Sequence, residues 1–387
     1  MASIEWWTIC LGVLCTGIVA QNSVVNYYEK EICTTSSGEQ GTCVYQYQCT
    51  DGVITSSGEN VIDIRQPGDG CIDYLMECCV ERSEPSTNVP TVNVPPYTIE
   101  GCGHRNPHGV IFTIENNQLS ETEYGEYPWT VAIFVREKNN SLKYLCGGAL
   151  IDQAAVLTTA TCLHPYRFNV PSLVVRLGEW DMSTNREPIP HIDSEMEKIF
   201  LHPEYSMTSK INDIAIIILR DTIELNHTVG VVCLPPASSN PGGAEVVGVG
   251  WGDVPNFVEP RKLRQTILKK THLRHVLHDL CEKALRNLMD RRYQLDRSFI
   301  CAEAQHTEML PCRGDTGSPY MMEIAHGIDR YYLVGLSSWG FDCNRQNAPT
   351  VLTNVAYHRD WIDAVIKQEN LNIWSYTYAE PISSDEE

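Results

Sequence analysis

The chain has 387 residues, and its 49 Asp and Glu against 29 Lys and Arg give a formal net charge of −20 at pH 7. This length accommodates one large domain together with a small one. So acidic a balance argues against nucleic acid or an anionic membrane as the main partner.

Residues 1–20 are predicted to be a secretory signal peptide. The segment is rich in Trp, Ile, Leu, Cys and Val, ends in the small residue Ala20, and is followed by no second apolar span. A short membrane anchor is the alternative, although the run is brief for a helix that crosses a bilayer. We therefore expect a secreted, extracellular protein with no membrane partner.

The cysteine content supports export. Of 16 cysteines, Cys10 and Cys15 lie in the leader, which leaves an even 14 in the mature chain. An even, clustered set in an exported protein indicates a disulfide framework. Two Asn-x-Ser/Thr motifs, at Asn139 and Asn226, predict N-linked glycosylation, with chance occurrence as the alternative for each.

A small unit is predicted over residues 30–82. Its Thr, Ser and Gly content and short apolar runs could not bury a core at this size, so disulfides worth roughly 2–4 kcal/mol each would have to supply the stability. Six cysteines are available for this, and their spacing alone leaves the pairing open: Cys33, Cys43, Cys49, Cys71, Cys78 and Cys79.

Arg65 is the only basic residue between Cys49 and Cys71. Exposed loop tips are preferred sites of proteolysis, and such a loop could enter a trypsin-like active site in extended form without unfolding a core. We therefore predict that Arg65 is a cleavage site. An ordinary solvated arginine is the alternative.

Residues 83–101, with several prolines among Ser, Thr, Asn and Val, are predicted to be an extended linker. Residues 102–370 contain short apolar segments separated by turn signals, such as Leu173–Leu177 and Ile214–Leu219. This pattern is typical of an all-β double barrel. Residues 371–387 are expected to form an acidic tail outside it.

Two helices and one basic stretch interrupt the barrel pattern. Apolar residues recur at helical spacing over 277–288 and 361–366. The basic stretch from Arg261 to Arg274 has Leu263 and Ile267 alternating with polar side chains. A half-buried strand with a solvated basic face is predicted there, with a partner-docking patch as the alternative.

Three short blocks resemble those around the catalytic triad of chymotrypsin-like serine proteases. Val156–Cys162 resembles the Leu-Thr-Ala-Ala-His-Cys block, but Thr161 stands at the position of the base His. Asn212–Ala215 matches the Asp-Ile-Ala block with Asp213 kept. Cys312–Pro319 resembles the Gly-Asp-Ser-Gly-Gly-Pro block, with Thr316 replacing the nucleophilic Ser and a Ser at the second Gly.

These replacements predict a protease fold without protease chemistry. The triad needs a histidine to take the proton of the serine hydroxyl, and the hydroxyl of Thr161 has far too high a pKa to act as that base. Asp213 would then orient nothing. Loss of either group costs about 10⁶ in turnover. An active enzyme with Thr316 as its nucleophile is an alternative, but no activating base is evident.

The same resemblance implies an altered substrate pocket and activation segment. Leu310 stands at the pocket floor, where trypsin-like members have an Asp, and Thr350 replaces a Gly of the pocket wall. The strand that pairs with substrate keeps Ser338, Trp339 and Gly340. Residues 115–119 replace the Ile-Val-Gly-Gly segment, so Asp315 would lack the new amino terminus as its partner; backbone hydrogen bonding is its alternative role.

The spacing of the first six cysteines, with adjacent Cys78 and Cys79, resembles the clip domain of arthropod proteases. Together with the degenerate triad, the chain is similar to masquerade-like clip-domain serine protease homologues of haemolymph (CLIPA-type). In these relatives Cys102 tethers the linker to the larger domain. The resemblance implies the following disulfides: Cys33–Cys78, Cys43–Cys71, Cys49–Cys79, Cys102–Cys233, Cys146–Cys162, Cys281–Cys301 and Cys312–Cys343. One pair common in the family is missing, because Val246 and Met322 occupy its positions.

The family resemblance implies a non-catalytic cofactor or regulator of an extracellular protease cascade, notably prophenoloxidase activation and melanisation in innate immunity. Its expected partners are clip proteases and prophenoloxidase, with no bound cofactor or metal. The alternative is an adhesion or pattern-recognition protein that binds microbial surfaces through the clip domain. The sequence leaves the partner, the direction of regulation and the oligomeric state open.

Overall fold

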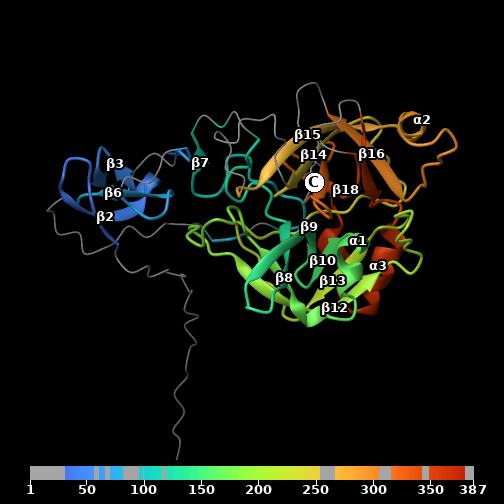
Figure 1. Ribbon diagram of the computed structural model, residues 1–387, viewed down its shortest axis with the longest axis horizontal. Helices are drawn as coiled ribbons and strands as arrows, with labels where there is room; N and C mark the ends of the chain where they lie inside the picture. The colour runs from blue at the N-terminus through green and yellow to red at the C-terminus, as the bar shows by residue number, and fades with distance from the viewer. Residues whose placement is uncertain are drawn as a thin grey trace, which may run out of the picture.

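The computed structural model describes residues 31–55, 61–65, 70–81, 96–98, 100–115, 117, 120–252, 266–304, 315–341 and 348–379. Two closed six-stranded β-barrels form the larger part, and a small β-rich N-terminal unit lies to one side of them (Figure 1). The all-β double barrel expected from the sequence is confirmed. No helix in the described part is both long enough and apolar enough to cross a bilayer. The predicted signal peptide lies outside the described residues.

The first barrel shows two burial patterns. Along β12, Ser194 and Met196 are buried whereas Glu195 and Glu197 are exposed, the alternation of a strand with one solvated face. The strand β13 is buried along its whole length, as a strand covered on both faces should be. The strands hydrogen-bond around the barrel in the order β10 (Ala155–Thr158), β13 (Ala215–Leu219), β12 (Ile192–Leu201), β11 (Leu173–Leu177), β8 (Thr130–Arg136) and β9 (Leu142–Asp152).

The second barrel has the same closed form without the usual cross-strand disulfide. Val246 on one strand is buried and Met322 on its neighbour packs against the same apolar cluster, so hydrophobic contact replaces the two missing cysteines. The strand order is β14 (Glu245–Gly250), β15 (Lys269–Val276), β16 (Phe299–Ala304), β19 (Thr350–Asn354), β18 (Tyr331–Trp339) and β17 (Pro319–Glu323).

The two predicted helices are present as α2 (His278–Leu288) and α3 (Arg359–Gln368), beside a one-turn α1 (Ala160–Leu163). Cys281 and Leu285 form the buried stripe of α2. The remaining short helices are 3₁₀ turns: Gln46–Gln48, His164–Tyr166, Val170–Ser172 and Ile373–Tyr376.

The basic stretch is less solvated than the sequence predicts. Its end forms the start of β15, and there the ammonium of Lys270 lies 2.8 Å from a carboxylate oxygen of Glu126, whose side chain is fully buried. Arg105 binds the same carboxylate. A buried carboxylate needs charged partners, and Lys270 is therefore turned inward instead of forming a solvated face. Residues 261–265 lie outside the described residues.

The boundary expected at residue 370 is wrong, because the chain packs onto the barrels through residue 379. The 3₁₀ turn Ile373–Tyr376 carries Tyr376, which is fully buried and donates its hydroxyl to Asp363 at 2.8 Å. The carbonyl of Tyr376 accepts from the amide of Leu234 at 2.8 Å, and Ser375 donates to Asp152. The buried ring of Tyr376 supplies this anchoring, and residues 371–379 contain no Asp or Glu, so the acidic part of the predicted tail begins only at Glu380.

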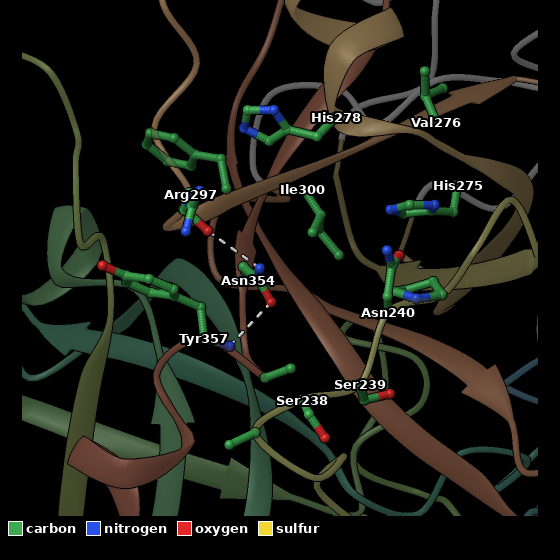
Figure 2. A pocket seen from close by; sticks show the side chains of 14 residues that line it. Ser238, Ser239, Asn240, His275, Val276, His278, Arg297, Ile300, Asn354 and Tyr357 are labelled. Atoms are coloured by element: carbon green, nitrogen blue, oxygen red, sulfur yellow. Dashed lines mark hydrogen bonds between the residues drawn. The ribbon is translucent and has the colours of Figure 1, made fainter.

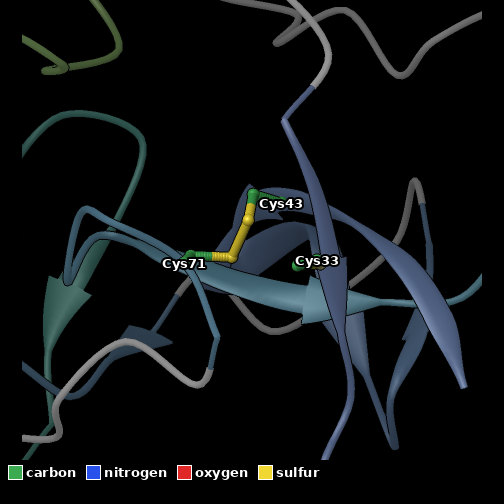
Figure 3. A group of neighbouring side chains, drawn as sticks. All are labelled: Cys33, Cys43 and Cys71. Carbon is green, nitrogen blue, oxygen red and sulfur yellow. A yellow bond between two sulfur atoms is a disulfide. The ribbon is translucent and has the colours of Figure 1, made fainter. Parts of the chain in front are cut away.

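The N-terminal unit is a three-stranded sheet, β1 (Ile32–Thr34), β2 (Gln40–Tyr45) and β6 (Met76–Cys79), beside the two-stranded pair β3 (Cys49–Thr50) and β4 (Val53–Ile54). Disulfides join its strands, and Figure 3 shows the bond between Cys43 and Cys71 next to Cys33. Six disulfides are present in the described part: Cys33–Cys78, Cys43–Cys71, Cys49–Cys79, Cys102–Cys233, Cys146–Cys162 and Cys281–Cys301. Cys312 and Cys343 lie outside the described residues.

The N-terminal unit shares its core with the first barrel, which the expectation of a coreless unit missed. Tyr47 stacks on Phe112 with ring centroids 6.0 Å apart, and Phe112 in turn stacks on Tyr124 and meets the edge of Trp180. All four rings belong to one buried cluster. The small unit therefore buries large aromatic side chains against the larger domain, in addition to a small cluster of its own around Cys33, Cys43, Met76 and Cys78.

Hydrogen bonds reinforce this contact. The hydroxyl of Tyr74 donates to the fully buried Asp181 at 2.6 Å, and Arg186 forms an ion pair with Glu31 at 2.8 Å. A parallel pair of short strands, β5 (Val61–Ile62) and β7 (Thr113–Ile114), also joins the two units.

Candidate functional site

Asp213 is the centre of the degenerate catalytic site, and it is fully buried between the two barrels' strands β13 and β18. Its carboxylate accepts from the amide of Thr161 at 2.6 Å, from the hydroxyl of Thr161 at 2.9 Å and from the hydroxyl of Ser338 at 2.5 Å. Burial raises the pKa of Asp213 above its ordinary value, and these hydrogen bonds oppose that rise.

The expectation that Asp213 orients nothing is therefore wrong. It holds Thr161 in place as an acceptor, and Thr161 also lies 3.0 Å from the hydroxyl of Tyr205. An alcohol oxygen is in any case far too weak a base to take a proton from a nucleophile near neutral pH. The aspartate is kept as a structural hydrogen-bond acceptor at a position that lacks a base.

The turn around Thr316 is held by backbone hydrogen bonds to neighbouring strands. The carbonyl of Thr316 accepts from the amide of Gly147, and the next residue, Gly317, donates to Ser337. Gly317 has a φ of 77°, and a Cβ there would overlap the Gly147 carbonyl and the Thr158 hydroxyl. Thr316 is half-buried on this turn.

Asp315 is held against backbone instead of by a cleaved amino terminus. Its carboxylate accepts from the amide of Gly252 at 2.9 Å, and a Cβ on Gly250 or Gly252 would overlap it. The segment that active proteases release is bound elsewhere: the amide of Glu115 donates to Ile62 of the N-terminal unit, and Asn117 donates to the carbonyl of Glu121. This hydrogen bond to the backbone corresponds to the alternative role that the sequence suggested for Asp315.

The predicted pocket residues are brought together in part. The ring of Trp339 packs edge-on against Tyr293 and Phe299, and a Cβ on Gly340 would lie 3.6 Å from the hydroxyl of Thr350. The Thr350 side chain thus faces Gly340 across the wall. The hydroxyl of Ser338 donates its hydrogen bond to the carboxylate of Asp213. Leu310 lies outside the described residues.

The two glycosylation motifs differ in their surroundings. Asn139 lies in an exposed turn between β8 and β9, where its side-chain oxygen accepts from Ser141. Asn226 is half-buried, its side-chain oxygen accepts from the backbone amides of Thr228 and Val229, and Thr228 is buried. Glycosylation at both positions remains a prediction, and the exposed turn favours Asn139.

Comparisons with known proteins agree with this geometry. The trypsin family model matches residues 117–362, and the model described as the serine protease clip domain of PPAF-2 matches residues 30–80. The chain is 31% identical to inactive CLIP domain-containing serine protease A28 of Anopheles gambiae, over 86% of this chain and 90% of that protein. It is 35% identical to phenoloxidase-activating factor 2 of Galleria mellonella, over 74% and 97% respectively.

A third relative is also named as inactive. It is inactive CLIP domain-containing serine protease A8 of Anopheles gambiae, 30% identical over 84% of this chain and 89% of that protein. This chain belongs to the clip-domain serine protease homologues. It is a catalytically inactive member of the trypsin family, in which Thr161 replaces the base.

In the described part of the homologue, one cluster of ionisable groups has the spacing of a metal site and contains no disulfide-bonded cysteine. Atoms of Glu179, Glu187 and His191 lie within 4.8 Å of one another. Burial, followed by the charge of Glu179, raises the pKa of Glu187 to about 9, while Arg176 pairs with Glu179 at 3.1 Å. At neutral pH Glu187 is therefore protonated in the folded protein, and Arg176 pairs with both Glu179 and Asp193.

Sequence reasoning missed the residues that dock the clip domain of the homologue. Tyr47 and Tyr74 are large aromatic residues in a unit that was considered too small to form a core. Their presence was the signal in the sequence that this unit buries side chains against another domain. Their partners Phe112 and Asp181 are far away in the chain, so the sequence alone could not pair them.

Proposed function

We propose that this homologue is a secreted, non-catalytic cofactor in an extracellular protease cascade that activates prophenoloxidase. The observation that carries this proposal is the Asp213–Thr161 contact, in which the buried carboxylate binds a threonine where an active protease has its base. Relatives named phenoloxidase-activating factors and inactive clip-domain proteases support the cascade. The disulfide framework suits the oxidising conditions outside the cell. A protein that has the protease fold but no catalytic base acts by binding.

We further propose that cleavage after Arg65 switches the cofactor. Arg65 is exposed, and its amide donates to Asp63 at 2.9 Å. The residue before it, Ile64, is only 2% exposed and belongs to the core shared with the first barrel. The expectation that a protease could reach this loop without disturbing a core is therefore wrong, because the chain before Arg65 must leave that core to enter an active site.

This burial gives the cut a structural consequence. Ile62 lies in the strand β5, which pairs with β7 of the larger domain, and its carbonyl accepts from Glu115. A cut after Arg65 frees the end of this strand, so the cleaved chain no longer has to hold Ile64 in the shared core. Three disulfides, Cys33–Cys78, Cys43–Cys71 and Cys49–Cys79, span the cut and keep the pieces together. The product is a rearranged clip domain, and the apolar surface it uncovers is the proposed docking surface.

A reconstituted cascade tests both proposals. Purified cascade protease and prophenoloxidase receive wild-type protein, Arg65→Gln or the matched control Arg65→Lys, which keeps a site for a trypsin-like protease. We expect phenoloxidase activity with wild type and Arg65→Lys, and a new amino terminus at Gln66. Arg65→Gln should stay intact and inactive. Full activity of Arg65→Gln removes the switch, and no effect of wild-type protein removes the cofactor role.

A further inference from the structure

A pocket unrelated to the catalytic remnant opens on the second barrel. It has a volume of about 540 Å³ and is lined by four segments. These are residues 237–241 between the barrels, the end of β15 with the start of α2, the start of β16, and residues 354–357 after β19. The size is that of a small-molecule site.

The charge of the pocket is opposite to that of the chain. No Asp or Glu is among its lining residues, and Arg297 is a permanent cation there, although the whole chain has a formal charge of −20. Arg297 is exposed and forms no ion pair in the described part of the chain. The carboxylate near His278 belongs to Asp279, which is 3.8 Å away and fully solvated. The pocket therefore favours an anion.

Two uncharged donors are oriented toward the same space. His275 is only 5% exposed, and its Nδ1 accepts from the amide of Gly243 at 3.1 Å, which places the proton on Nε2. The side-chain oxygen of Asn240 accepts from the amide of Gly242, which leaves its NH₂ group to donate. Figure 2 shows His275 and Asn240 across the pocket from Arg297.

The opposite wall is aromatic and fixed. Asn354 donates to the carbonyl of Arg297 and accepts from the amide of Tyr357, both at 3.2 Å, and so holds these two residues beside each other (Figure 2). Tyr357 is 51% exposed, whereas Phe299, which also lines the pocket, is only 1% exposed. An exposed ring beside amide and hydroxyl groups suits the C–H face of a sugar.

We propose that this pocket binds an acidic saccharide of about two rings. In this assignment Arg297 and His278 hold its carboxylate or sulfate, His275 and Asn240 donate to its oxygen atoms, and Tyr357 packs against a ring. Basic groups alone would fit an acidic peptide as well, and the exposed aromatic wall with surrounding hydroxyl and amide groups favours the saccharide. The proposal is independent of the cofactor role and of cleavage at Arg65.

Calorimetric titration of the full-length secreted protein tests the assignment. The probes are a sulfated uronic-acid disaccharide, the same disaccharide without sulfate, and neutral cellobiose. We expect binding of one or both acidic sugars and at least about tenfold weaker binding of cellobiose, the factor that one lost charged hydrogen bond produces. Arg297→Gln and His278→Gln should each weaken acidic-sugar binding by about tenfold, and Tyr357→Ala by about fivefold.

Arg136→Gln provides the matched control, because Arg136 is an exposed arginine on β8 of the other barrel. It makes the same change in net charge and should leave binding within twofold of wild type. Three results would overturn the proposal: no acidic sugar binds, cellobiose binds equally well, or Arg136→Gln and Arg297→Gln weaken binding equally. Binding of a triglutamate peptide in place of either sugar would also overturn it.

Discussion

The carboxylate of Asp213 accepts two hydrogen bonds from Thr161, one from the backbone amide at 2.6 Å and one from the hydroxyl at 2.9 Å. In an active triad this carboxylate would orient an imidazole. Here it satisfies its own buried charge with a residue that cannot accept a proton. The site therefore has a stable hydrogen-bond arrangement of its own, which restoring the nucleophile alone would not convert into a catalytic one.

Thr316→Ser should not create protease activity. The serine would occupy the same turn, but Thr161 would still supply no base, so turnover should stay about 10⁶-fold below that of an active relative. Peptide amidase assays with Arg, Phe or Val at the cleavage position measure this, together with labelling by a fluorophosphonate probe. Labelling of the wild-type protein that Thr316→Ala abolishes would contradict it.

Thr161→Val should destabilise the protein by about 1–3 kcal/mol. The substitution is nearly isosteric and keeps the backbone bond, but it removes a hydroxyl donor from a buried carboxylate, leaving part of that charge unsatisfied. Urea unfolding under oxidising conditions gives the difference. Thr208→Val is the matched control, because Thr208 is exposed and its change should stay within about 0.5 kcal/mol. Equal stability of the two variants would refute the role assigned to Thr161.

Glu187→Gln should flatten the dependence of stability on pH. Between the ordinary pKa of 4.5 and the value of about 9 in the folded protein, Glu187 is ionised when unfolded and protonated when folded. Folding therefore takes up a proton, so the free energy of unfolding falls as pH rises through this window, by up to about 1.4 kcal/mol per pH unit. Glutamine imitates the protonated form and removes this slope.

Chemical unfolding at pH 5, 6.5 and 8 measures the effect. Relative to wild type, the free energy of unfolding of Glu187→Gln should increase by at least about 1 kcal/mol from pH 5 to pH 8. This is the free energy that corresponds to one pKa unit. Glu197→Gln, at an exposed position of β12, should keep the wild-type slope. Parallel curves for wild type and Glu187→Gln would show that Glu187 is not protonated in the folded protein at these pH values.

Tyr74→Phe should loosen the clip domain on the larger domain. The change removes the donor to Asp181 while keeping the ring, at a cost of about 1–3 kcal/mol for a buried carboxylate left with fewer partners. Hydrogen exchange should rise at the contact, in β5 and β7, and remain unchanged in α3. Tyr357→Phe, an exposed tyrosine of the other barrel, is the control. Unchanged exchange at β5 in Tyr74→Phe would mean that the aromatic stack alone holds the clip domain.

The fold could be predicted from the sequence because its signals are local. Short apolar strands, two helical stretches and the order of the triad blocks each lie within a few residues of chain, and they led to the double barrel. The boundary at residue 370 failed because one buried ring, Tyr376, decides it, and that ring packs against residues that are distant in the chain.

The lost chemistry was determined by the sequence alone. A threonine at position 161 lacks a basic nitrogen in any fold, so no arrangement of neighbours could make it the base. What Asp213 does instead depended on the tertiary structure, since its donors Thr161 and Ser338 are distant in the chain. The burial of Ile64 and the basic pocket at Arg297 were likewise decided only by folding, because burial and local charge arise from segments that meet in space.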